Sequence, residues 1–423
     1  MTDDGPVLLP QPSQGMSRLR LAARPQPSQD RSRLRLAARL ATGVLTALTA
    51  AATAGLARFF VHRILNVDRA KLYDIPVLAL ADGTVRLGAT DNSLLPGTYG
   101  LTWPGAPGDP DGHAIVGPIV SIDDIPAVRG QRRLAREPLH RTVTRDLVEV
   151  REGQLAVGLD TTWEQYAYLG DPGTAHGLDF VEFDLPGELG MFPTWLLPGD
   201  GGSRWVIAVH GRGGSRGETM RILPTLAALG LPTLIPSYRN DVGAPATADR
   251  YYHLGETEWH EIDEAMAYAL EHGATELVLY GWSMGGAIVL QAAVRSKRAD
   301  SVIALILDSP VIDWRDTLRA NARVNRLPRP SAELGLMMVQ RRLQLDLDDF
   351  DWVARAAELT RPMLIFHGPE DAFVPWERGL ALAKARPDLV SMVTYEGAAH
   401  TKSWNVDPDG YQREVRDFLL GLP

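Results

Sequence analysis

The sequence contains no cysteine and only four lysines among its 423 residues. The absence of cysteine excludes disulfide bonds, a thiol nucleophile and thiolate metal sites. It leaves the compartment open, because a large domain can fold outside the cell without disulfides. Positive charge is carried almost wholly by arginine, and the formal net charge is −9. An acidic balance of this kind argues against a nucleic acid as partner.

The first segment, residues 1–39, has little apolar sequence. It is rich in proline, glutamine and serine, and it holds seven arginines against three aspartates. A polar, charged segment of this composition cannot bury enough apolar surface to fold alone. We therefore predict a disordered basic tail over residues 1–39.

The next segment lacks charge, since no charged residue occurs from 40 to 57. As a helix this run would span about 27 Å, barely the thickness of a membrane core. We interpret residues 40–65 as a membrane anchor or signal helix, with membrane association through residues 40–57. The basic residues before it predict a cytoplasmic N-terminus, with the rest of the chain at the cell membrane but outside the cytoplasm. The alternatives are secretion after cleavage near the Ala-Thr-Ala sequence at 52–54, and a surface helix of a cytoplasmic protein.

Residues 66–175 have short apolar bursts separated by glycine, proline and aspartate. Such spacing predicts strands and turns, so we expect a β-rich accessory region here. It contains no motif to which we can assign chemistry, and we interpret it as a structural platform.

From about residue 176 the pattern changes to alternating strands and helices. Apolar runs such as residues 303–307 are continuous, as in strands that are buried on both faces. The alternation predicts an α/β catalytic domain over residues 176–423, with a mostly parallel sheet and helices on both faces. Residues 310–360 interrupt it with helical, charged sequence, which we assign to a small helical cap, an ordinary connection being the alternative.

The chemistry centres on residues 281–285, which read Gly-Trp-Ser-Met-Gly. A predicted strand comes before this motif and a predicted helix after it. This is the context of a nucleophile elbow, in which a serine lies on a strained strand-to-helix turn. We predict that Ser283 is the nucleophile, and that Gly281 and Gly285 are small because strand and helix pass closely there.

A serine nucleophile needs a base, and the base needs an acid. Asp371 follows a predicted strand at 363–366, and His400 follows another at 392–395. Both would therefore lie at the carboxyl edge of the sheet, together with Ser283. The sequence predicts a Ser283–His400–Asp371 triad in the chain order of this elbow.

Other acidic and histidine residues could serve as the acid or the base of the triad. Asp308 also ends a predicted strand, and Glu370 is adjacent to Asp371, so either could replace Asp371 as the acid. His367 is expected to be structural, because it lies in the turn that presents Asp371. His260 is expected on the surface of a helix.

The reaction also needs an oxyanion hole of backbone N–H groups. One donor should be the residue after the nucleophile, Met284. The other should come from the loop at 210–214, which reads His-Gly-Arg-Gly-Gly. We assign it to the Arg212 N–H, with Gly211 as the alternative, and we expect His210 to pack within the loop.

These four motifs together resemble the α/β-hydrolase superfamily, over roughly residues 176–423. The arrangement is most similar to the monoacylglycerol-lipase and serine-aminopeptidase-like branch, and to Bem46-type membrane-anchored hydrolases. The resemblance implies an eight-stranded, mostly parallel sheet and neither a metal nor an organic cofactor. Residues 236–241 resemble a loop that approaches the site in those proteins. Arg239 or Asp241 in that loop would contact substrate, or else form an ion pair that orders the loop.

The predicted activity is that of a serine hydrolase that cleaves carboxylic esters with small or lipid-like acyl groups through an acyl-enzyme. The partner is therefore an acyl substrate. A peptidase or amidase would use the same triad, and an acyltransferase would replace water by an alcohol. A catalytically silent ligand-binding scaffold is the alternative of another class. The sequence leaves the physiological substrate and the oligomeric state open.

Overall fold

The computed structural model describes residues 27–67, 70–124 and 140–423, with side chains from residue 32 onward. The chain divides into two compact units, Met1–Thr53 and Ala54–Pro423. Helix α1 (Pro27–Leu65) contains a stretch, Ser32–Leu65, that is long and apolar enough to cross a membrane. The prediction of disorder is wrong for residues 27–39, which are helical because their leucines, alanines and arginines favour a helix. Residues 1–26 lie outside the described part.

In the second unit, residues 54–65, which we call the foot of α1, belong to the folded domain. Ala57 and Phe60 are at most 1% exposed, and Val61 and Leu65 are also buried. Phe60 packs against α7 (Arg329–Leu343), and a Cβ added to Gly335 in that helix would lie 2.8 Å from the Phe60 ring. The helix that is apolar enough for a membrane therefore also contributes to the core of the catalytic part.

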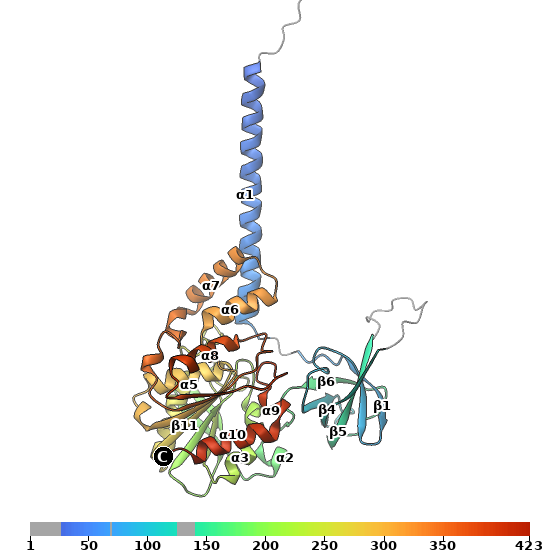
Figure 1. Cartoon of the computed structure of the whole chain (residues 1–423), viewed down its shortest axis with the longest axis vertical. Coiled ribbons are helices and arrows are strands. Elements are labelled where there is room, and N and C mark those ends of the chain that lie inside the picture. Colours follow the sequence, from blue (N-terminus) through green and yellow to red (C-terminus); the bar gives the residue numbers. More distant parts are fainter. Residues whose placement is uncertain (1–26, 68–69, 125–139) are drawn as a thin grey trace, which may run out of the picture. The chain divides into compact units, whose positions relative to one another are not determined.

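The β-rich accessory region is a closed barrel with strand order β1-β2-β5-β4-β3-β6 and antiparallel pairs throughout (Figure 1). Its strands are β1 (Ile75–Ala81), β2 (Thr84–Gly88), β3 (Tyr99–Trp103), β4 (Gly112–Asp124), β5 (Arg141–Glu152) and β6 (Asp160–Glu164). Their buried side chains form a core of their own. A fully buried arginine, Arg145 on β5, lies beside the Tyr99 and Trp163 rings.

The catalytic part is built on an eight-stranded sheet with the order β14-β13-β12-β11-β9-β10-β8-β7. Its strands are β7 (Val181–Gly187), β8 (Gly190–Leu197), β9 (Arg204–Val209), β10 (Thr233–Pro236), β11 (Glu276–Trp282), β12 (Val302–Asp308), β13 (Met363–Phe366) and β14 (Val390–Val393). From β14 to β10 the neighbouring strands are parallel. β8 pairs antiparallel with β10 and β7 antiparallel with β8. The sheet is thus mixed, because β8 runs opposite to the other strands and forms antiparallel pairs with both of its neighbours at one edge.

Helices cover both faces of this sheet (Figure 1). The residues of α4 (Trp259–Glu271), α5 (Met284–Arg295) and α8 (Trp376–Ala385) share one hydrophobic core. Those of α3 (Leu223–Ala228) and α10 (Pro408–Leu420) share another. Short helices also occur, α2 (Pro172–His176) before the sheet and α9 (Ser403–Val406) before α10. Residues 310–360 form α6 (Trp314–Val324), α7 and two short 3-10 turns, as the helical sequence indicates.

Candidate active site

Ser283 lies on the turn between β11 and α5 with φ of +53° and ψ of −115°. This conformation is strained for a residue with a side chain, as the elbow requires. The turn is tied to the next strand, because the Ser283 N–H donates to the Asp308 carbonyl at 2.9 Å. The strain therefore serves to present the hydroxyl at the carboxyl edge of the sheet.

The two elbow glycines are required by close backbone contacts. A Cβ on Gly281 would lie 2.4 Å from the carbonyl oxygen of Gly285. A Cβ on Gly285 would lie 2.1 Å from the carbonyl oxygen of Val209, at the end of β9. Helix α5 thus starts directly against the neighbouring strand, which agrees with the reason we gave for glycine at both positions.

The structure brings the three predicted triad side chains together. His400 Nε2 lies 2.8 Å from Ser283 Oγ, and His400 Nδ1 lies 2.7 Å from Asp371 Oδ2. The nucleophile, base and acid therefore form a continuous hydrogen-bonded chain. The hydroxyl can lose its proton to the imidazole, and the carboxylate can stabilise the imidazolium that results.

Asp371 is held as an ionised carboxylate. Its Oδ1 accepts the N–H groups of Phe373 and Val374 at 2.8 and 2.9 Å, and its Oδ2 also accepts from His367 Nε2 at 3.1 Å. Burial alone would raise the pKa of Asp371, but its contacts with His400 and His367 hold that pKa well below its usual range. His367 has the structural role that we expected in this turn.

The rival acids lie elsewhere. Asp308 is fully buried and accepts the hydroxyl of Tyr411 at 3.0 Å, and burial raises its pKa. Glu370 is exposed in the turn. His260 is partly exposed, 3.7 Å from Glu188. Among these carboxylates, Asp371 is the one bonded to His400 in the part of the chain that the structure describes.

The oxyanion hole would be formed by backbone N–H groups near Ser283. Met284 is the first residue of α5, so its N–H has no partner within the helix. The Gly211 N–H donates to Glu218 Oε2 at 2.7 Å. Gly211 is therefore already engaged, which favours Arg212 over it as the second donor. His210 is fully buried and pairs with Asp241 at 2.9 Å, the packing role that we expected.

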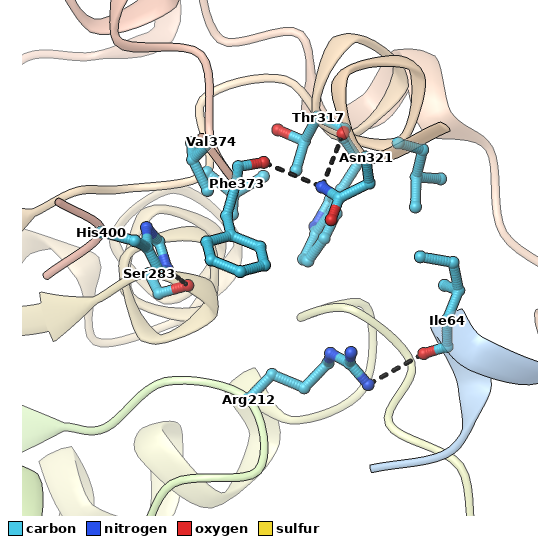
Figure 2. A pocket seen from close by; sticks show the side chains of 11 residues that line it. Ile64, Arg212, Ser283, Thr317, Asn321, Phe373, Val374 and His400 are labelled. Carbon is cyan, nitrogen blue, oxygen red and sulfur yellow. Dashed lines mark hydrogen bonds between the residues drawn. The ribbon is translucent and has the colours of Figure 1, made fainter. Parts of the chain in front are cut away.

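A cavity of about 190 Å³ opens beside Ser283 and His400. Figure 2 shows the Phe373 ring beside Ser283 and His400, and Arg212 reaching Ile64 at the end of α1. Arg212 Nη1 donates to the Ile64 carbonyl at 2.8 Å. The remaining lining side chains come from the segment before α6, from α6 itself and from the Asp371 turn: Val311, Trp314, Thr317, Leu318, Asn321 and Val374.

Sequence reasoning missed most of this lining. α6 lies in the segment that we assigned to a cap, and Phe373 is close to Asp371, so both carried a signal. Ile64 carried none, because it lies 219 residues before Ser283 in sequence, inside the predicted anchor.

The prediction that Arg239 or Asp241 contacts substrate is wrong for this pocket. Neither residue lines the cavity at Ser283. Arg239 is 4% exposed and forms a buried ion pair with Glu261 at 2.6 Å. Asp241 accepts hydrogen bonds from His210 and from the Tyr252 hydroxyl. Both residues order the loop after β10, which is the alternative that we left open.

Lys402, two residues after His400, is buried, and its Nζ donates to the His400 carbonyl at 3.1 Å. Burial, and then the charge of Arg221, lower its pKa from 10.5 to about 8. The unfolded chain binds the proton more tightly than the folded one, so this group makes the free energy of unfolding rise between pH 8 and 10. We expect a rise on the order of 2 kcal/mol, missing in Lys402→Met. Denaturant titrations at both pH values measure this rise. The same rise in the free energy of unfolding in the wild type and in Lys402→Met would contradict the prediction.

Within the residues that the structure describes, no group of three or more histidine, aspartate or glutamate side chains is arranged to hold a metal ion.

Comparison with known proteins links both folded regions to families. A family model described as the α/β hydrolase fold matches residues 204–328, which include Ser283 but neither Asp371 nor His400. A second model, a domain of unknown function named DUF8805, matches residues 76–164, that is, the barrel.

Among curated proteins, the chain is 22% identical over 252 residues to the uncharacterized protein YfhR of Escherichia coli K12, covering 59% of this chain and 82% of YfhR. It is 27% identical over 160 residues to the α/β hydrolase domain-containing protein 17C of Xenopus tropicalis. That match covers 37% of this chain and 42% of the relative, so the chain spans less than half of that relative's length.

Solved structures with a similar chain trace include two esterases. Esterase Pf2001 of Pyrococcus furiosus has 16% identity and a TM-score of 0.48, over 60% of this chain and 94% of the esterase. Est1E of Butyrivibrio proteoclasticus, solved with ferulic acid, has 21% identity and a TM-score of 0.46, over 57% and 98%.

Proposed function

The chain belongs to the α/β-hydrolase superfamily, and we propose that it is a serine hydrolase that cleaves carboxylic esters. The observation that carries the proposal is the continuous chain from Ser283 Oγ through the His400 ring to Asp371 Oδ2, with contacts of 2.8 and 2.7 Å. A strained serine conformation and helix-terminal N–H groups next to it support the same reaction.

The geometry supports the following reaction. Ser283 Oγ attacks the ester carbonyl carbon while His400 Nε2 takes its proton, and Asp371 stabilises the imidazolium. The N–H groups of Met284 and Arg212 receive the oxyanion. The carbon–oxygen bond to the alcohol then breaks, and His400 gives its proton to the leaving oxygen. Water repeats the sequence on the acyl-enzyme, releasing the acid and restoring Ser283.

The pocket supports a short acyl group. Its volume of about 190 Å³ lies below the 300–1,000 Å³ that is usual for drug-sized ligands. Part of its wall is apolar, with Val311, Trp314, Leu318 and Phe373 among the side chains there, beside the polar Thr317 and Asn321. An apolar wall favours the acyl side of an ester over a charged peptide.

The proposal extends to membrane association through residues 40–57, with the catalytic part outside the cytoplasm. It is supported by the apolar stretch in α1 and by the arginines that precede it. Ile64, which lines the pocket, follows the uncharged run by only seven residues, about 11 Å of helix.

A substrate panel on the full chain in detergent tests this proposal. p-Nitrophenyl butanoate should be hydrolysed at least ten times faster than p-nitrophenyl palmitate, because the cavity is short, and faster than the p-nitroanilide of butanoic acid. Faster cleavage of the anilide would instead favour an amidase or peptidase. A folded protein that turns over none of the three would favour a ligand-binding scaffold.

A further inference from the structure

The barrel contacts the catalytic part at several places, among them Arg151 with α2, and the contact nearest to the His400 loop is the residue pair Thr98 and Asn405. The Thr98 N–H donates to the Asn405 carbonyl at 2.8 Å, and Asn405 Nδ2 donates to the Thr98 carbonyl at 2.7 Å. Gly97 lies beside them with φ of +103°, and a Cβ there would lie 2.0 Å from the Asn405 carbonyl oxygen. The barrel backbone therefore approaches α9 as closely as a glycine permits.

Asn405 is fully buried, and its side-chain amide forms hydrogen bonds both to the barrel and to the catalytic part. Its Nδ2 also donates to the Gln165 carbonyl at 3.0 Å, just after the last barrel strand. Its Oδ1 accepts from Arg221 Nη1 at 2.9 Å. Because a buried amide that loses its partners costs free energy, these bonds fix the position of α9 as long as the barrel is docked.

Arg221 extends the contact to both loops of the candidate active site. Its Nη1 donates to the carbonyl of Thr401, the residue after His400, at 2.8 Å. Its Nη2 lies 3.4 Å from Glu218 Oε1, and Glu218 Oε2 accepts the Gly211 N–H at 2.7 Å. One buried arginine thus joins the barrel contact to the histidine and to the loop that carries the Arg212 N–H.

A second connection runs through Lys402. Its Nζ donates to Gln165 Oε1 at 3.0 Å and to the His400 carbonyl at 3.1 Å. The segment that leaves the barrel is therefore bonded, through one side chain, to the backbone of the catalytic histidine.

The barrel loop that makes the contact is held from within. Arg145 donates to the carbonyls of Ser93 and Leu95 at 2.9 and 2.8 Å, and also to that of Gly97. Its Nε donates to the Gly117 carbonyl at 2.9 Å. A buried cation that satisfies four carbonyls makes the loop a rigid surface rather than a flexible strap.

We propose that the barrel is a positioning element for catalysis, in which the contact of Gly97 and Thr98 with Asn405 holds the loops of His400 and Arg212 in reacting geometry. This inference rests on the proposed function of the triad. None of these bonds joins the barrel directly to a residue that lines the pocket. Loss of the contact between the barrel and Asn405 should therefore affect turnover more than substrate binding. An error of about 1 Å in such a geometry lowers a rate on the order of 100-fold.

Two glycine variants of the full chain test the proposal. Gly97→Ala forces a methyl group into the Asn405 carbonyl. Gly108→Ala is the matched control, because Gly108 has a similar φ of +98° in another barrel loop with nothing within 4 Å of an added Cβ. For ester hydrolysis we expect kcat to fall 10- to 100-fold in Gly97→Ala with KM within about twofold, and Gly108→Ala to match the wild type. Equal kcat in both variants would overturn the proposal.

Asn405→Ala keeps the backbone carbonyl but removes the side-chain bonds of the same contact, to the Thr98 and Gln165 carbonyls and to Arg221, and it covers the case in which Gly97→Ala fails to fold. The double variant should be no slower than the slower single variant, because both changes break one interaction. If the two reductions in kcat instead multiplied in the double variant, the two residues would not share one contact.

Hydrogen exchange separates this inference from the proposed function. In the wild type, the amides of residues 97–99 and 401–406 should be protected, and both segments should lose protection in Gly97→Ala. Protection of 401–406 that is unchanged in the variant would overturn the proposal whether or not the enzyme is active. An inactive wild type with coupled protection would refute only the esterase assignment and keep the barrel as the element that orders the His400 loop.

Discussion

A fluorophosphonate probe is expected to label the wild-type chain at Ser283, and labelling should vanish in Ser283→Ala. In Asp371→Asn we expect kcat/KM for an ester to fall on the order of 10³- to 10⁴-fold at neutral pH. The reason is that Asp371 Oδ2 accepts from His400 Nδ1 at 2.7 Å. An amide at this position turns a donor toward the ring, so that the imidazole no longer presents a basic Nε2 to the serine. Labelling rates and ester kinetics measure both effects.

A matched control is available for each of these residues. Glu370→Gln removes a neighbouring, exposed carboxylate and should leave the kinetics within about twofold. Ser391→Ala removes an exposed serine on β14 and should keep full labelling. Labelling that persists in Ser283→Ala, or an Asp371→Asn enzyme as active as Glu370→Gln, would exclude this triad.

Replacing Phe60 by alanine is expected to lower the free energy of unfolding by about 3 kcal/mol or more, as for other fully buried phenylalanines. Phe60 is 1% exposed and packs in the same core as the helices over the sheet. Its neighbour Phe59 is 52% exposed, so Phe59→Ala should change stability by less than about 0.5 kcal/mol. Urea titration in detergent measures both values.

The comparison within this pair also tests whether the foot of α1 belongs to the catalytic part in solution. Equal and small effects of both variants would mean that residues 54–65 are detached from the domain. Because Ile64 lines the pocket, a detached foot would also remove one of its walls.

The triad could be predicted because each of its members carries a local signal. Ser283 lies in a glycine-rich motif, and Asp371 and His400 each follow an apolar run that ends in a polar turn. Strand order was not needed, since parallel strands bring their carboxyl ends to one edge. The sequence already favoured Asp371 over Asp308, although both follow strands, and in the structure Asp371 is bonded to His400 whereas Asp308 accepts the Tyr411 hydroxyl.

The features that could not be predicted depend on contacts between distant segments. Arg239 was a reasonable substrate contact by its place in a loop, but its partner Glu261 lies on α4, and the sequence does not reveal this pairing. The barrel is visible in sequence only as short strands; its closure and its contact with Asn405 arise from tertiary structure. The early start of α1 could not be predicted from the polar composition of residues 27–39, because the leucines and alanines between the serines, glutamine and arginines favour a helix there.

The foot of α1 determines what proteolysis near the N-terminus would release. The boundary between the two compact units falls between Thr53 and Ala54, within the Ala-Thr-Ala sequence at 52–54. A cut after Ala54 would shed a polypeptide that keeps Phe60 and Ile64, and with them an intact pocket wall. A cut after Leu65 would shed one without them. Where a protease cuts over these eleven residues therefore decides whether the released part keeps this wall of the pocket.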